Sequence, residues 1–150
     1  MIFELSSLGM IDIVNRQRRR KIETKQWRAF GEEALKSIGA KKPNVTIVFV
    51  GDNAIRELNR RFRGKDYATD VLSFPSAAEP FEKENRSHLG EVVISVQRAT
   101  AQAQSNRLSF ENEVKQLILH GLLHLCGYDH ETDNGEMNRL ELRLRKRLGI

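Results

Sequence analysis

Three histidines near the C-terminal end of the chain constrain its fold more than any other sequence feature. On an α-helix, residues four apart share a face, so His120 and His124 can present two imidazole nitrogens to one metal ion. A glycine accepts the left-handed conformation that commonly ends a helix, so we expect Gly127 to stop this one and His130 to turn back toward the first two. Cys126 follows His124 by two residues, roughly 200° around the helix, and is expected to point away. The pattern predicts a helix that ends in a three-histidine metal site.

A site with three protein ligands is typical of catalytic zinc, because structural zinc sites are usually closed by four. We therefore expect one Zn²⁺ per chain, bound by His120, His124 and His130 with water in the fourth position. Zinc lowers the pKa of such a water toward about 7, which favours hydrolysis or acyl or phosphoryl transfer. Two alternatives stay open here: three ordinary polar or core histidines, and another metal, because imidazole also suits nickel, copper and iron.

The residue after the first histidine separates two of the possible reactions. The spacing H-x3-H-x2-G-x2-H is also that of the metzincin proteases, in which a glutamate at this position acts as general base. Here the position holds Gly121, so peptide hydrolysis by that route lacks the carboxylate that takes a proton from water and passes it to the leaving amine. RNA cleavage depends less on such a residue, because a neighbouring 2′-hydroxyl can act as nucleophile while a metal and cations stabilise the phosphate.

The composition fits one compact soluble domain spanning residues 1–150, with 39% hydrophobic and 30% charged residues. The single cysteine cannot form an internal disulfide, and the first residues lack the basic and apolar segments of a secretory signal. No apolar run approaches the roughly 20 residues of a membrane span. We expect a cytoplasmic protein with no membrane contact and no disulfide partner.

The formal net charge of +5 favours a polyanionic partner. Basic residues cluster in three runs, at 16–21, 60–65 and 143–147, and the last run can be explained by the negative end of a helix. A guanidinium binds phosphate in parallel pairs of hydrogen bonds, so we expect Arg63 to bind RNA, with Arg60, Arg61 and Lys65 beside it. The alternative for Arg63 is a surface ion pair with Asp66.

Hydrophobic periodicity predicts helices that alternate with about four strands. The β-branched run 45–50 predicts a central strand, and the helical spacing of Ile55, Leu58 and Phe62 predicts the buried face of a helix after Asp52. The polar segment 76–86 is expected to be a mobile loop. The other expected elements are strands at 10–15, 70–75 and 89–96, and helices at 24–38, at 97–106, from Ser109, and after a capping sequence at 133–136. The fold class is α/β (α+β), a small mixed sheet packed with helices, with a strand order that cannot be read.

Residues 59–75 carry the pattern N-x3-R-x2-D-x2-T-D-V-L-S-F-P, and residues 120–130 carry H-G-x-L-H-L-x-G-Y-D-H. With a third block, these patterns resemble those of the YbeY family of endoribonucleases. The third block is 89–95, where Glu91 stands in place of the family's usual aspartate. The similarity runs through most of the chain after about Val45.

The resemblance implies a metal-dependent, single-strand-specific endoribonuclease, with zinc on His120, His124 and His130 and catalytic roles for His120 and Arg63. Its implied partners are ribosomal RNA and the ribosome, in maturation of the 3′ end of the small-subunit (16S) RNA and in ribosome quality control. The implied fold is a small α/β domain whose metal helix is similar to that of metzincin-type metalloproteases. The sequence leaves the oligomeric state open.

Three carboxylates are candidates for groups that orient the metal ligands. They belong to Asp70, Asp129 and Glu113, and the alternative for Glu113 is an exposed carboxylate.

Two other classes of function compete with the endoribonuclease. One is a metalloprotease or amidohydrolase with an unidentified base, and the other is a non-catalytic ribosome-associated factor that contains zinc.

Overall fold

The computed structural model describes residues 11–76 and 87–150, which form four strands and five helices. The expected mobile segment therefore lies outside the described residues, except for Ser76. The elements in chain order are β1 (Ile11–Asn15), α2 (Thr24–Ile38), β2 (Asn44–Val50), α3 (Asp52–Arg63), β3 (Val71–Pro75), β4 (His88–Ser95), α4 (Val96–Asn106), α5 (Phe110–Leu125) and α6 (Glu136–Leu148). Each expected element is present, and the α/β fold class is confirmed.

The four strands form one mixed sheet in the order β1-β2-β4-β3. β1, β2 and β4 are parallel neighbours, whereas β3 runs antiparallel to β4 and forms one edge. The run expected to be a central strand is β2, which lies between two others. Within it Ile47 and Phe49 are fully buried, as the β-branched and aromatic composition predicts.

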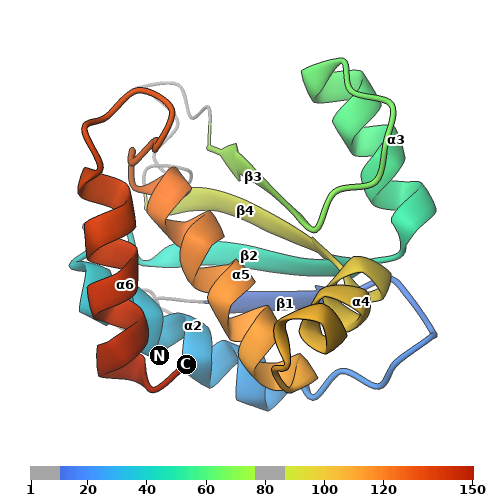
Figure 1. Cartoon of the computed structure of the whole chain (residues 1–150), viewed down its shortest axis with the longest axis horizontal. Coiled ribbons are helices and arrows are strands. Elements are labelled where there is room, and N and C mark those ends of the chain that lie inside the picture. The colour runs from blue at the N-terminus through green and yellow to red at the C-terminus, as the bar shows by residue number, and fades with distance from the viewer. Residues whose placement is uncertain (1–10, 77–86) are drawn as a thin grey trace.

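Four of the helices cover one face of the sheet, and α3 lies on the opposite face (Figure 1). The larger core joins the sheet to α2, α4, α5 and α6, through residues such as Phe30, Ile47, Val92, Ile118 and Leu144. Ser109 caps α5 by accepting a hydrogen bond from the backbone N–H of Asn112, as expected from the sequence. These contacts fix α5, which carries two of the histidines, against β3 and β4.

Helix α3 makes a smaller second core, and one expectation about its buried face is wrong. Ile55 is fully buried and Leu58 packs beside it, but the side chain of Phe62 is 61% exposed. The reason is geometric, because the C-terminal end of α3 projects past the sheet (Figure 1). The helical period gives the side of the helix on which Phe62 lies, but it does not show where the sheet beneath ends.

Candidate metal centre

The three histidines expected from the sequence converge on one point. Two come from the last turns of α5 and the third from the turn after it, where Gly127 has a left-handed φ of +96°. One ligand atom from each of His120, His124 and His130 lies within 4.8 Å of the other two. His120 and His124 are half-buried and His130 is exposed, so the cluster opens toward solvent on one side.

The donor set and its spacing fit a tetrahedral metal ion. The Nε2 atoms of His120 and His124 face each other at 3.1 Å. Two nitrogens bound to one Zn²⁺ at about 2.05 Å with tetrahedral angles would lie about 3.3 Å apart. Cys126 is not in the cluster and lines a different cavity, beside Leu125 and Tyr128. Among the described residues the cluster therefore offers three nitrogen ligands.

A carboxylate from α6 holds one of the three rings. The Oε1 atom of Glu141 lies 2.9 Å from Nδ1 of His120, and Arg145 donates a hydrogen bond of 2.7 Å to Oε2. Burial raises the pKa of Glu141, but the hydrogen bond and charge of His120, together with Arg145, outweigh it, so the pKa is lowered overall. An ionised carboxylate only accepts, so Nδ1 carries the proton and Nε2 is free to bind a metal.

The ring of His124 is also suited to a metal. Partial burial lowers its pKa, and the nearby charges of His120 and His130 act in the same direction. A lowered pKa favours the neutral imidazole, which is the form that binds a metal ion.

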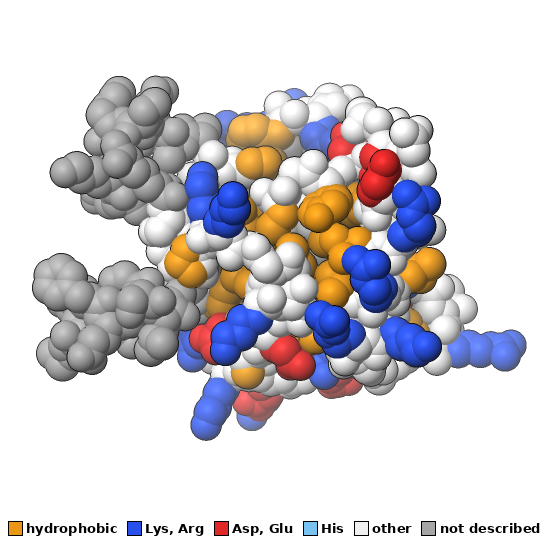
Figure 2. Space-filling view, turned by 90° about the vertical axis from the view of Figure 1, so that its left-hand side faces the viewer, with side chains coloured by type: hydrophobic (Ala, Val, Ile, Leu, Met, Phe, Trp, Pro, Cys, Tyr) orange, Lys and Arg blue, Asp and Glu red, His pale blue; other side chains and the backbone are white. Residues whose placement is uncertain are grey.

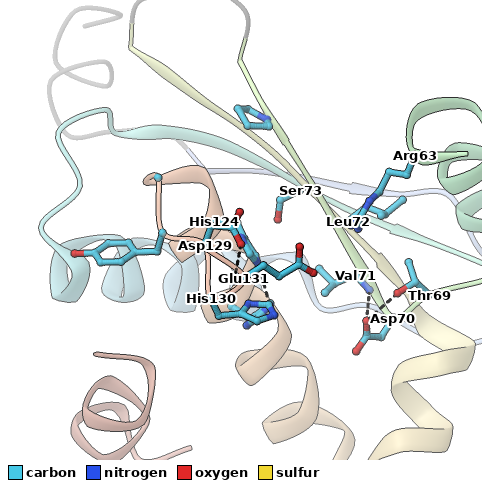
Figure 3. A pocket seen from close by; sticks show the side chains of 14 residues that line it. Arg63, Thr69, Asp70, Val71, Leu72, Ser73, His124, Asp129, His130 and Glu131 are labelled. Carbon is cyan, nitrogen blue, oxygen red and sulfur yellow. Dashed lines mark hydrogen bonds between the residues drawn. The ribbon is translucent and has the colours of Figure 1, made fainter. Parts of the chain in front are cut away.

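A cleft of about 470 Å³ opens in front of the three imidazoles. One wall is the segment 69–73 with Arg63, and the other is the helix end and the turn 127–131 (Figure 3). Figure 3 shows Arg63 across the cavity from His124 and His130. The structure thus brings two sequence blocks, some 60 residues apart, to one cleft.

The proposed ion pair between Arg63 and Asp66 is wrong. Asp66 accepts a hydrogen bond of 2.9 Å from Arg56 instead, and its pKa is lowered by that bond and by the charge of Arg56. Arg63 is exposed, and no ion pair involves it within residues 11–76 and 87–150. Its guanidinium is available to a ligand in the cleft.

The other basic residues of this run lie outside the cleft lining. Arg60 is paired with Glu57 at its own helix surface, and Arg61 lies over the ring of Phe62 at 5.5 Å from the centroid. Lys65 is exposed. Figure 2 shows Lys and Arg spread over another face of the molecule, with hydrophobic side chains between them. The positive charge alone therefore does not locate a binding site.

In the described parts of the chain, the three acidic candidates accept hydrogen bonds from groups other than histidine. Asp70 accepts from the backbone N–H of Val71 at 2.8 Å and Asp129 from that of Glu131 at 3.0 Å, and both carboxylates line the cleft. Glu113 is not an exposed carboxylate, since it is 3% exposed and accepts a hydrogen bond of 2.8 Å from Asn106.

Sequence reasoning missed Glu141, although a signal was present. It lies four residues after Met137 and three before Leu144, so a carboxylate occupies the buried stripe of α6. A charged residue in such a stripe requires a partner. Nothing in the sequence said that the partner would be His120.

Gly121, which occupies the position of the protease glutamate, faces the sheet. A Cβ atom there would lie 2.7 Å from Cγ1 of Val92 and 3.1 Å from Oγ of Ser73. Ser73 also donates a hydrogen bond of 3.1 Å to the carbonyl oxygen of Gly121. The helix and the sheet are too close at this point for a glutamate side chain.

The fold and the site together define a small α/β protein in which three histidines that could hold a metal ion border a cleft that Arg63 also lines. The model of the family Endoribonuclease YbeY matches residues 12–149. The chain belongs to the YbeY family.

Curated relatives and a solved structure agree with this assignment. The chain is 38% identical to Endoribonuclease YbeY of Geobacter metallireducens over 93% of its length and 94% of the relative's. It is 46% identical to that of Solibacter usitatus over 81% and 76% of the two chains. The solution structure of TM1509 from Thermotoga maritima is similar at a TM-score of 0.60 and 28% identity, covering 93% of this chain and 90% of that one.

No helix in the described parts of the chain is long and apolar enough to cross a membrane.

Proposed function

We propose that this protein is a zinc-dependent endoribonuclease that cleaves single-stranded RNA. The names of its relatives support the endoribonuclease activity, and the three convergent histidines support the metal. The observation that carries the proposal is the placement of Arg63 across one cleft from the three convergent imidazoles. A guanidinium and a metal-ligand cluster in the same cleft provide for the two needs of phosphodiester cleavage, which are phosphate positioning and charge stabilisation.

The chain's own residues have distinct parts in this mechanism. His120, His124 and His130 would hold the zinc ion, which would supply a Lewis acid for the negative charge on the phosphate. Arg63 binds a phosphate oxygen and orients the scissile bond, because its charge is permanent and no carboxylate competes for it among the described ion pairs. Glu141 keeps the proton of His120 on Nδ1.

We further infer that residues 1–150 form a single metallohydrolase domain and that its substrate is ribosomal RNA in the cytoplasm. The family match over residues 12–149 supports one domain. The net charge of +5 supports a nucleic-acid substrate such as the 3′ region of the small-subunit RNA, in maturation and in ribosome quality control. Arg60, Arg61 and Lys65 lie beside Arg63 in sequence and extend the basic surface toward the RNA.

The two competing functions are less well supported. A protease of the metzincin type needs a glutamate where Gly121 lies against Val92. A purely structural zinc site would be closed by a fourth protein ligand, whereas within residues 11–76 and 87–150 this cluster has three candidate ligands and borders a cleft.

The test is cleavage of a labelled small-subunit ribosomal RNA precursor by zinc-loaded protein. The control is His124→Ala protein purified in the same way, which excludes a contaminating nuclease. Cleavage by the wild type alone supports the proposal. Equal cleavage by both proteins, or cleavage of peptides without cleavage of RNA, overturns it.

A further inference from the structure

The C-terminal end of α3 and the loop after it expose two large aromatic side chains. Phe62 is 61% exposed and Tyr67 is 54% exposed. Only one other large hydrophobic residue in the described parts of the chain, Leu142, is exposed to this degree. Two of three such residues thus lie within six positions of each other, and Arg63, which lines the cleft, lies between them.

The two aromatic residues are held in place by the fold. The ring of Phe62 packs edge-on against Phe74 of β3, with centroids 5.4 Å apart. Gly64 turns the chain back with a left-handed φ of +69°, and the buried Asn59 donates a hydrogen bond of 2.9 Å to the carbonyl oxygen of Tyr67. The backbone that carries both exposed side chains is therefore fixed. Because little of it has to be ordered when a ligand binds, the entropic cost of binding is low.

The charge around them is positive. The acidic side chains of segment 56–67 are Glu57 and Asp66, and each is paired with an arginine of the same segment. Arg61, Arg63 and Lys65 remain, with no ion pair among the residues that the structure describes. Cations without an ion pair thus alternate along the sequence with exposed aromatic residues, and one of these cations, Arg63, lines the cleft.

We propose that Phe62 and Tyr67 form a stacking subsite for unpaired RNA bases, which seats the strand while Arg63 holds its phosphate in the cleft. This inference rests on the proposed function, and it explains how the cleft would select single-stranded RNA. Surfaces that bind single strands combine aromatic rings for the bases with cations for the backbone, and bases inside a duplex cannot stack on the protein. The subsite therefore favours single-stranded over double-stranded RNA.

The experiment measures binding of short fluorescent 2′-O-methyl oligonucleotides, which lack the 2′-hydroxyl nucleophile. Three probes of equal length are compared: a single strand, the same strand with abasic sites, and a duplex. The variants are Phe62→Leu and Tyr67→Leu, which keep apolar bulk but remove the ring. The matched controls are Phe62→Tyr and Tyr67→Phe, which keep it. Thermal unfolding confirms that each variant is folded.

We expect each leucine variant to bind the single strand on the order of tenfold more weakly, with abasic and duplex binding unchanged. The aromatic controls should bind all three probes as the wild type does. Equal wild-type affinity for the single strand and the abasic strand overturns the inference. An equal loss of affinity for all three probes also overturns it, because it would indicate a general effect on charge or folding. Binding of the single strand by the leucine variants at wild-type affinity overturns it as well, and would indicate that the exposed rings contact a protein partner instead.

Cleavage of unmodified RNA by the wild type is measured separately. If base-dependent binding is present but cleavage is absent, the endoribonuclease proposal fails and the stacking subsite stands. If cleavage is present but the leucine variants bind and cleave as the wild type does, the subsite fails and the endoribonuclease proposal stands.

Discussion

His120 and Glu141 join α5 to α6 through a hydrogen bond of 2.9 Å between Nδ1 and a carboxylate oxygen. The second oxygen of Glu141 accepts from Arg145, one turn further along α6. The carboxylate is 7% exposed, so its ionised form depends on these two partners. Packing of the last helix therefore determines which nitrogen of His120 faces the other two histidines.

The first prediction concerns this carboxylate. Glu141→Gln removes the charge that holds the proton on Nδ1, and we expect zinc affinity to fall about 10-fold to 100-fold. Competition with a chromogenic chelator measures the affinity. Glu111→Gln, at an exposed position in the first turn of α5, is the control because it removes the same charge elsewhere. Unchanged zinc affinity in Glu141→Gln would show that the hydrogen bond has no part in metal binding.

The second prediction concerns the coupling of metal binding to stability. A ligand that binds only the folded state stabilises it by RT ln(1 + [L]/Kd), about 2.7 kcal/mol at 100 times Kd. We expect added zinc to raise the melting temperature of the wild type, and chelation to reverse the change. His124→Ala should bind no zinc at this site and show no such rise. A zinc-dependent rise of equal size in the variant would place the metal elsewhere.

The third prediction separates phosphate binding from metal binding. Arg63→Glu places a negative charge in the cleft and should reduce RNA turnover strongly, because it repels the substrate phosphate. Zinc content should stay at the wild-type value, since Arg63 is not among the clustered ligand atoms. Arg98→Glu, an exposed change of equal charge in α4, controls for loss of net positive charge. RNA turnover equal to that of the control would remove Arg63 from the mechanism.

The fourth prediction uses the close contact of α5 with the sheet. In Gly121→Ala the new Cβ would lie 2.7 Å from Val92 Cγ1, and Val92 is fully buried. Overpacking of this kind costs about 1–3 kcal/mol, more than the roughly 1 kcal/mol that alanine gains in a helix. We expect a lower free energy of unfolding in urea. Val92→Ala should then lower the free energy of unfolding less in the Gly121→Ala background than in the wild type. If the two substitutions lower this free energy by purely additive amounts, the steric explanation is contradicted.

Local features of the sequence predicted the helices and strands well. The bounds of α2 are those expected, because Trp27, Phe30, Ala34 and Leu35 recur at the helical period and Gly39 ends the helix with a φ of +79°. The convergence of the three histidines was predicted for the same reason, since two lie on one helix and the third follows a short turn.

Features that depend on how elements meet could not be predicted. The exposure of Phe62 depends on where α3 passes the sheet edge, and the pairing of Asp66 with Arg56 depends on the loop turning back along the helix. The contact of Glu141 with His120 requires α6 to dock on α5. The hydrophobic periodicity of a helix carries no information on which residues of another element it will contact.

The last prediction concerns the start of α6 and has a definite sign in pH. Asp133 accepts hydrogen bonds of 2.9 Å from the backbone N–H groups of Met137 and Gly135, and these bonds lower its pKa in the folded state. A lowered folded-state pKa contributes stability above the unfolded value, about 3.9, and this contribution is lost as pH falls through the folded value. Asp133→Asn should therefore lower the urea midpoint at pH 6, and the difference from the wild type should shrink toward pH 3. A difference that stayed constant or grew on acidification would show that the charge of Asp133 does not stabilise the helix start.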